Sequence, residues 1–109
     1  MIHLTATTPI RLALAPVDFR RGIDGFVALC QNELHQEPRS GTLFVFINRT
    51  KTMVRLLAYE ENGYWLMTKR LSHGTYQGWP RAGAPVTAFQ AKALRQLLSN
   101  MLKSPHESF

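Results

Sequence analysis

The sequence predicts a single domain of the α+β class, in which two helices pack on an antiparallel sheet of about four to five strands. Three observations lead to this prediction. The run Leu43–Ile47 is apolar, β-branched and aromatic, as is typical of a central strand. The dipeptide Asn62-Gly63 lies between two strand-like runs and is a strong signal for a hairpin turn. Two segments, starting near Asp24 and Thr87, repeat apolar residues at helical spacing.

The size and composition fit one domain with its own core. The chain has 109 residues, of which 45% are hydrophobic, and it contains no internal repeat or linker-like tract. Its single cysteine, Cys30, excludes a disulfide framework, and no Cys/His pair lies at zinc-binding spacing. We expect one domain over residues 1–103, followed by a short disordered tail at residues 104–109.

Targeting signals are not found in the sequence. The first residues carry no basic segment followed by an apolar run, and no apolar stretch reaches the roughly 18 residues of a membrane span. A lone thiol is also typical of a reducing compartment. We therefore expect a cytoplasmic protein without a membrane partner.

The first part of the chain predicts a strand followed by a helix. Apolar residues alternate with others along Ile10–Leu14, and Pro16 ends this strand. Asp24 is a good N-cap residue, and Pro38 prevents the following helix from continuing. The apolar residues of that helix are Phe26, Val27, Cys30 and Leu34.

The middle of the chain predicts three consecutive strands. Leu43–Ile47 is apolar enough to be buried on both faces, and strand-like runs at residues 52–60 and 64–71 lie on either side of the hairpin signal. Frequent glycines and prolines then leave room only for a short strand near residues 75–77.

Thr87 is expected to cap the last helix. An apolar stripe follows it, made of Leu94, Leu97, Leu98, Met101 and Leu102. Packing on the sheet is the ordinary role of such a stripe. A stripe wider than the sheet can cover would instead dock on a partner or on a second copy of the chain.

The expected hairpin brings like charges together. A two-residue turn at Asn62-Gly63 sets Arg55 opposite Arg70. Because two cations side by side repel each other, this pair indicates a polyanion or carboxylate that neutralises them, with simple solvation as the alternative. A different turn would change the register and separate the two arginines.

The charge balance gives a broader functional indication. The chain has 13 Lys and Arg against 7 Asp and Glu, a net charge of +6 and a pI of about 10.1. The basic side chains cluster in the middle of the chain, which favours a polyanion such as nucleic acid as the partner. The alternative is that the charge serves solubility alone.

A second cluster of charges precedes the first helix. Between Asp18 and Gly25, two arginines and two glycines lie where the N–H groups of a helix N-terminus favour an anion such as a backbone phosphate. In the alternative, Asp18 and Asp24 cap helical turns and pair with Arg20 and Arg21 on the surface. The segment lacks the Gly-Lys-Ser/Thr ending of a P-loop, so nothing indicates nucleotide hydrolysis.

Neither the aromatic residues nor the acids indicate a specific activity. Aromatic side chains interleave with the basic segment, as stacking of single-stranded bases would require, but core packing is their more ordinary role. They are Tyr59, Tyr64, Trp65, Tyr76 and Trp79. Acids that could be imagined as nuclease metal ligands are Asp18, Asp24, Glu60 and Glu61, with His73 as a base. Their spacing matches no catalytic motif, so we expect no enzyme, no metal and no cofactor.

Four segments together suggest a family. Residues 16–26 contain the signature Asp-x-Arg-Arg-Gly-x-Asp-Gly, and Gly41–Phe46, Lys69–Leu71 and Trp79-Pro80 follow it. In this order they resemble the TnpB accessory protein encoded by bacterial transposons of the insertion sequence 66 family. The resemblance implies a part in transposition beside a separate large transposase, with no settled biochemical activity of its own.

The residues and the resemblance together predict a non-catalytic accessory protein of DNA transposition that binds DNA phosphates through a basic surface. The expected nucleic-acid-binding residues are Arg20, Arg21, Arg49, Lys51, Arg55, Lys69 and Arg70. DNA and the cognate transposase are the expected partners. The alternative is a protein–protein adaptor that docks on the transposase, or forms a homodimer, through its C-terminal helix.

Overall fold

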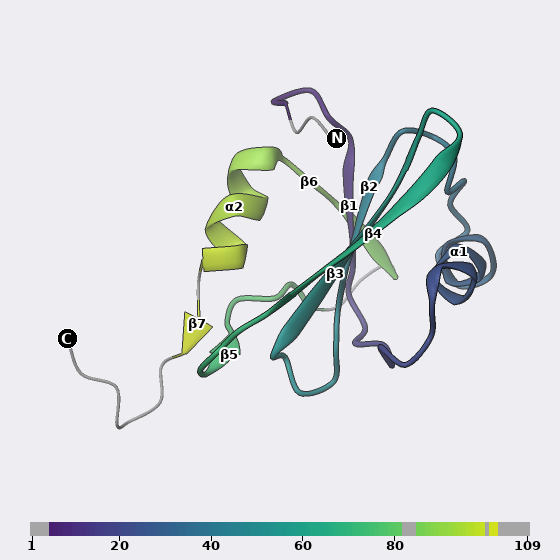
Figure 1. The fold of residues 1–109 in the computed structure, drawn as a ribbon. Coiled ribbons are helices and arrows are strands. Elements are labelled where there is room, and N and C mark those ends of the chain that lie inside the picture. Colours follow the sequence, from purple (N-terminus) through teal and green to yellow (C-terminus); the bar gives the residue numbers. More distant parts are fainter. Residues whose placement is uncertain (1–4, 82–84, 100, 103–109) are drawn as a thin grey trace.

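The computed structural model, which describes residues 5–81, 85–99 and 101–102, has a five-stranded sheet between two helices (Figure 1). The sheet has the strand order β4-β3-β2-β1-β6. Its strands are β1 (Ile10–Ala13), β2 (Leu43–Ile47), β3 (Met53–Glu60), β4 (Gly63–Arg70) and β6 (Val86–Phe89). The other elements are α1 (Ile23–Asn32), α2 (Ala91–Ser99), β5 (Thr75–Tyr76) and β7 (Met101–Leu102), and β5 pairs with β7. The predicted α+β class, strand number and two packed helices are confirmed, as is the short strand near residue 75.

The sheet contains one parallel pair. β1 and β2 run parallel because α1 crosses between them, whereas every other neighbouring pair in this sheet is antiparallel. The predicted antiparallel character therefore holds except at this pair. β1 lies inside the sheet, where Ile10 pairs with Leu43 on one side and with Phe89 on the other.

Each face of the sheet has its own apolar core. Side chains alternate along β2, so that Val45 packs on the α2 side while Phe44 and Phe46 pack on the α1 side. All five residues of β2 are buried, as predicted. Phe26, Leu29 and Cys30 of α1 fill one core, and Ala91, Leu94 and Leu97 of α2 fill the other. Neither helix in the described part of the chain is long and apolar enough to span a bilayer.

Both expected helix caps are wrong. Gly22 is the N-cap of α1, where its carbonyl accepts the Phe26 N–H, and Asp24 lies inside the first turn. Thr87 lies in β6, where it pairs with Leu12 of β1, and α2 begins only at Ala91. The open side of β1 needs a partner strand, and that requirement outweighs the capping preference of a threonine.

The apolar stripe of the last helix is shorter than expected. Leu94 and Leu97 are buried, but α2 ends at Ser99, and Met101 and Leu102 belong to β7. The expected tail at residues 104–109 lies outside the described residues.

The hairpin turn lies one residue earlier than predicted. Glu60 pairs with Gly63, so the two loop residues are Glu61 and Asn62, with Glu61 at a φ of +60°. This register pairs Leu57 with Leu66, whereas the expected one would set Leu57 against Thr68. Cross-strand apolar pairing thus outweighs the local preference of the Asn-Gly dipeptide.

The change of register separates the two arginines. Arg55 lies opposite Thr68, and Arg70 lies opposite Met53. The predicted like-charge pair does not form, and its argument for a bound polyanion is lost.

Candidate nucleic-acid interface

Basic residues gather at the end of the sheet where β2 ends, β3 begins and β4 ends (the lower end in Figure 1). Arg49 and Lys51 lie in the turn between β2 and β3, while Lys69 pairs with Val54 and Arg70 with Met53 at the start of β3. The loop before α1 joins this end because Val17 forms a parallel bridge with Asn48. We call this region the basic end; its predicted binding residues are Arg20, Arg21, Arg49, Lys51, Lys69 and Arg70. Arg81, which the sequence did not single out, lines a hollow with Lys51 at the same end.

A buried amide fixes the turn that carries Arg49 and Lys51. Asn48 is 8% exposed, and its Oδ1 accepts the N–H groups of Thr52 and Met53 at 2.9 and 3.0 Å. Its Nδ2 donates to the hydroxyls of Thr50 and Thr52, both at 3.1 Å. These bonds satisfy a buried polar side chain completely and hold the turn in one shape.

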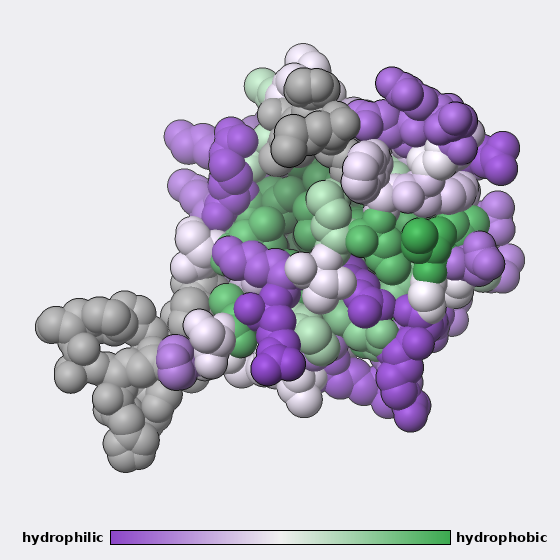
Figure 2. Space-filling model, viewed as in Figure 1, coloured by the Kyte–Doolittle hydropathy of each residue, from purple (hydrophilic) through white to green (hydrophobic). Residues whose placement is uncertain are grey.

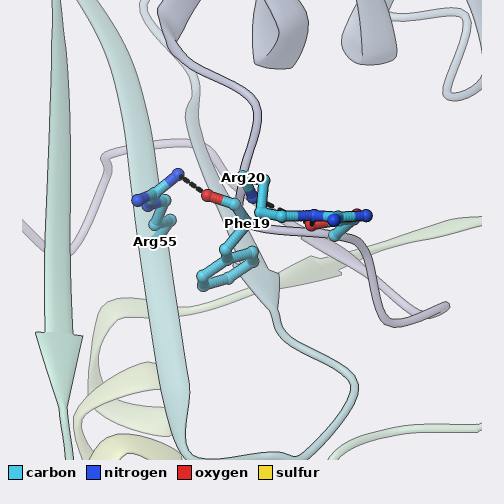
Figure 3. Close-up of polar contacts among 4 residues, drawn as sticks. Phe19, Arg20 and Arg55 are labelled. Atoms are coloured by element: carbon cyan, nitrogen blue, oxygen red, sulfur yellow. Dashed lines mark hydrogen bonds and ion pairs between the residues drawn. The ribbon is translucent and has the colours of Figure 1, made fainter.

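Arg55 faces the protein instead of the solvent (Figure 3). Its Nη1 donates to the carbonyls of Phe19 and Arg21 at 2.8 and 3.0 Å, and its Nε donates to Thr68 Oγ1 at 2.8 Å. The guanidinium carbon also lies 5.0 Å from the ring centre of Phe19 and 5.4 Å from that of Phe26. The side chain predicted to contact DNA therefore ties the loop before α1 to β3.

Arg20 and Asp18 form a surface ion pair, which is the part of the alternative for this segment that the structure bears out. The Arg20 Nε and Nη2 donate to the Asp18 carboxylate over 2.7–3.1 Å, and the Arg20 backbone N–H donates to the same group at 2.9 Å. The side-chain bonds first and the backbone bond second lower the pKa of Asp18 from 3.8 to about 2. The Arg20 side chain remains 91% exposed, so it still faces solvent. The positive charge of Arg49 lowers the same pKa, so its charge also acts at this loop.

A hollow of about 560 Å³ lies beside this ion pair. It is lined by Asp18, Arg20, Arg21, Gly25, Ala28, Leu29, Asn32 and Glu33. Gly25 lets α1 approach the loop, because a Cβ there would meet the Arg21 Cβ at 2.7 Å. Two arginines and the carboxylates of Asp18 and Glu33 line the hollow together, so it is mixed in charge.

The aromatic residues do not form one stacking surface. Tyr76 and Trp79 are buried in the α2-side core, as core packing predicts, and Trp79 Nε1 donates to the Ala13 carbonyl at 3.0 Å. Tyr59 and Tyr64 pack edge to face on each other with ring centres 4.9 Å apart. The remaining aromatic, Trp65, is 46% exposed at the opposite end of the sheet.

The acids are equally dispersed. Asp18 lies at the basic end, whereas Glu60 and Glu61 lie at the hairpin turn. Within the described ranges, no three His, Cys, Asp or Glu side chains are grouped so that they could hold a metal ion. Burial raises the pKa of the Cys30 thiol to about 12, which makes it unreactive.

Sequence reasoning missed the roles of Asn48 and Arg55. The alternation of Asn48 with Thr50 and Thr52 is a usable signal, since short polar side chains at such spacing often bond each other across a turn. No comparable signal marks Arg55, whose carbonyl partners lie more than thirty residues earlier in the chain.

Comparison with known proteins agrees with the signature before α1. The family model of the IS66 Orf2 like proteins matches residues 8–106. The chain belongs to this family. IS66 Orf2-like proteins are accessory proteins associated with transposition, so the predicted family and process are confirmed. The match indicates no catalytic family.

Two relatives come from Sinorhizobium fredii. The uncharacterized protein y4jC is 39% identical over 67 residues, which are 62% of this chain and 57% of that protein. The uncharacterized protein y4hO is 30% identical over 99 residues, 90% of this chain and 85% of that protein. The chain thus spans little more than half of y4jC but most of y4hO. No solved structure matches it.

Proposed function

We propose that this IS66 Orf2-like protein is a non-catalytic accessory factor that binds DNA phosphates through the basic end. The supporting observation is the register of the sheet, which gathers Arg49, Lys51, Lys69 and Arg70 around one turn held by a buried asparagine. Cations on a fixed support lose little conformational freedom on binding a phosphate backbone.

The predicted binding residues divide into two roles in this proposal. Arg20, Arg21, Arg49, Lys51, Lys69 and Arg70 contact phosphates. Arg55 acts indirectly, because its hydrogen bonds to the Phe19 and Arg21 carbonyls hold the loop that carries Arg20 and Arg21. Contacts of this kind give weak sequence preference and a strong dependence on salt.

The salt dependence of DNA binding tests this proposal. The double variant Lys69→Gln, Arg70→Gln removes two charges from the basic end, and the matched control Lys92→Gln, Arg95→Gln removes two from exposed positions on α2. Titration of a short duplex should show that the log-log salt slope flattens by about two units in the first variant and not in the control. Absence of binding by the unaltered protein at low salt, or equal effects of the two variants, would overturn the proposal.

The cognate transposase is the proposed protein partner. The apolar stripe expected to dock on it is largely occupied, because Leu94 and Leu97 are buried against the protein's own sheet. We therefore favour DNA contact over the adaptor alternative. Co-purification with the transposase, with and without transposon-end DNA, separates the two, since an adaptor would be retained without DNA.

Absence of catalysis is tested separately. With Mg²⁺ or Mn²⁺, the purified protein should leave single- and double-stranded DNA intact. Cleavage that disappears in a folded Asp18→Ala variant would show that the proposal of a non-catalytic factor is wrong.

A further inference from the structure

β4 is an edge strand of eight residues with one side open among the described elements. Its other side pairs with β3 along its whole length, and the Leu71 N–H continues this pairing by donating to the Thr52 carbonyl at 2.9 Å. Because backbone groups alternate in an antiparallel pair, those of every second residue from Tyr64 to Arg70 point away from β3. They form a row of donors and acceptors suited to another strand.

The side chains of this strand are unusually apolar for an edge. Trp65 is 46% exposed and Met67 is 37% exposed, and they account for two of the three exposed large hydrophobic residues in the described part of the chain. Their partners on β3 are Ala58 and Leu56, which pack in the α2-side core. This core ends before it covers β4. Figure 2 views the molecule from this edge and shows hydrophobic surface on both sides of the strand.

The charges at the two ends of β4 have opposite sign. Lys69 and Arg70 lie at its C-terminal end, and Glu60 and Glu61 lie at the hairpin turn where it begins. An antiparallel neighbour with the same sequence would therefore meet opposite charge at both ends. A parallel neighbour would meet like charge at both ends, which is destabilising.

We propose that β4 pairs antiparallel with β4 of a second copy, around a twofold axis at Leu66. This register sets Trp65 of each copy beside Met67 of the other, on the face that α2 leaves open. It also sets Lys69 opposite Gly63, where the missing side chain lets the lysine reach Glu60 on the next strand. The outward backbone groups of Tyr64, Leu66 and Thr68 find partners, and the two sheets become one. The proposal rests on the edge strand and not on DNA binding, although Lys69 belongs both to this contact and to the proposed phosphate-binding residues.

A pair of complementary variants tests the arrangement at physiological salt without DNA, with molecular mass measured by sedimentation equilibrium. Trp65→Lys and Met67→Glu each disrupt both copies of the apolar contact, so each should weaken the dimer by about tenfold or more. Mixing the two variants should restore it, because the new amine of one copy then faces the new carboxylate of the other. A mixture of Trp65→Lys with Met67→Lys should not.

Ile23→Lys is the matched control, since Ile23 is the third exposed large hydrophobic residue and lies on α1. It should leave the dimer intact. Leu66→Cys provides a second measurement, because residues on the axis lie within disulfide distance and should form an intermolecular disulfide, whereas Ile23→Cys should not. Cys30 is fully buried and does not interfere. A monomeric unaltered protein, a mixture that stays monomeric, or a dimer lost equally in Ile23→Lys would overturn the proposal.

Discussion

The two ends of β3 are built from different kinds of contact. At the basic end, Asn48 and Arg55 make hydrogen bonds from buried or half-buried positions to backbone groups, Asn48 across its own turn and Arg55 to the loop before α1. At the hairpin end, the contacts join exposed or half-exposed side chains to each other: Tyr59 packs on Tyr64, Trp65 donates to Glu60, and the Arg39 guanidinium lies 5.2 Å from the Tyr59 ring centre. A lost side chain leaves unpartnered polar groups at the basic end, whereas water can replace most contacts at the hairpin end.

The largest effect is expected for Arg55→Ala. The change leaves the Phe19 and Arg21 carbonyls without their donor and removes the cation from two aromatic rings. The free energy of unfolding should fall by about 2–4 kcal/mol in a denaturant titration. Arg70→Ala, on the exposed end of β4, is the control and should change it by less than about 0.5 kcal/mol. Equal stability of the two variants would show that the hydrogen bonds of Arg55 do not stabilise the basic end.

Asn48→Ala should have the next largest effect. It removes the acceptor of the Thr52 and Met53 N–H groups, at a cost of about 1–3 kcal/mol in thermal or denaturant unfolding. The neighbouring exposed residue provides the control, and Arg49→Ala should be close to neutral. A neutral Asn48→Ala would mean that the turn does not depend on the buried amide.

The ion pair of Asp18 and Arg20 makes the stability of the basic end depend on pH. The folded-state pKa of Asp18, about 2, lies below its ordinary value of 3.8, so the pair contributes stability above pH 3.8 and loses it as pH falls towards 2. Asp18→Asn should be less stable than the unaltered protein at neutral pH, and the difference should shrink within that window. A difference that stays constant down to pH 2 would contradict the assignment of the shift to this carboxylate.

The smallest effect is expected at the hairpin end. Gly63 begins β4 without a positive φ, and a Cβ there would meet nothing within 4 Å. Gly63→Ala should therefore leave stability unchanged or raise it by up to about 1 kcal/mol in thermal unfolding. A clear loss of stability would instead favour a turn at Asn62-Gly63 and would undermine the register of the whole hairpin.

The apolar pattern of the strands made much of the fold predictable. Leu43–Ile47 is long and apolar enough to indicate a buried central strand, and the runs on both sides of residues 61–62 indicate a hairpin whatever its turn. The turn position was not predictable from the dipeptide, because the pairing of Leu57 with Leu66 decides it across two strands. The position of β6 likewise depends on β1, far away in the sequence.

The candidate site also contains one contact that the sequence indicates and one that only the folded chain creates. The pairing of Asp18 with Arg20 was foreseeable, because the two residues are two positions apart in the chain. Arg55 could not be recognised as an internal anchor, because only folding brings it to the Phe19 and Arg21 carbonyls. Sequence alone counts a lysine or arginine as a surface charge, and only tertiary structure distinguishes a charge that faces solvent from one that holds a loop.

The place of β1 inside the sheet has a consequence for synthesis on the ribosome. β1 can pair with β2 as soon as both have been translated, but its other edge stays open until Val86–Phe89 emerges. Until then Ile10 and Leu12, which are fully buried in the finished sheet, lack their last neighbouring strand. A message cut short before this point would therefore yield an aggregation-prone chain with an exposed strand edge, and not a smaller working accessory protein.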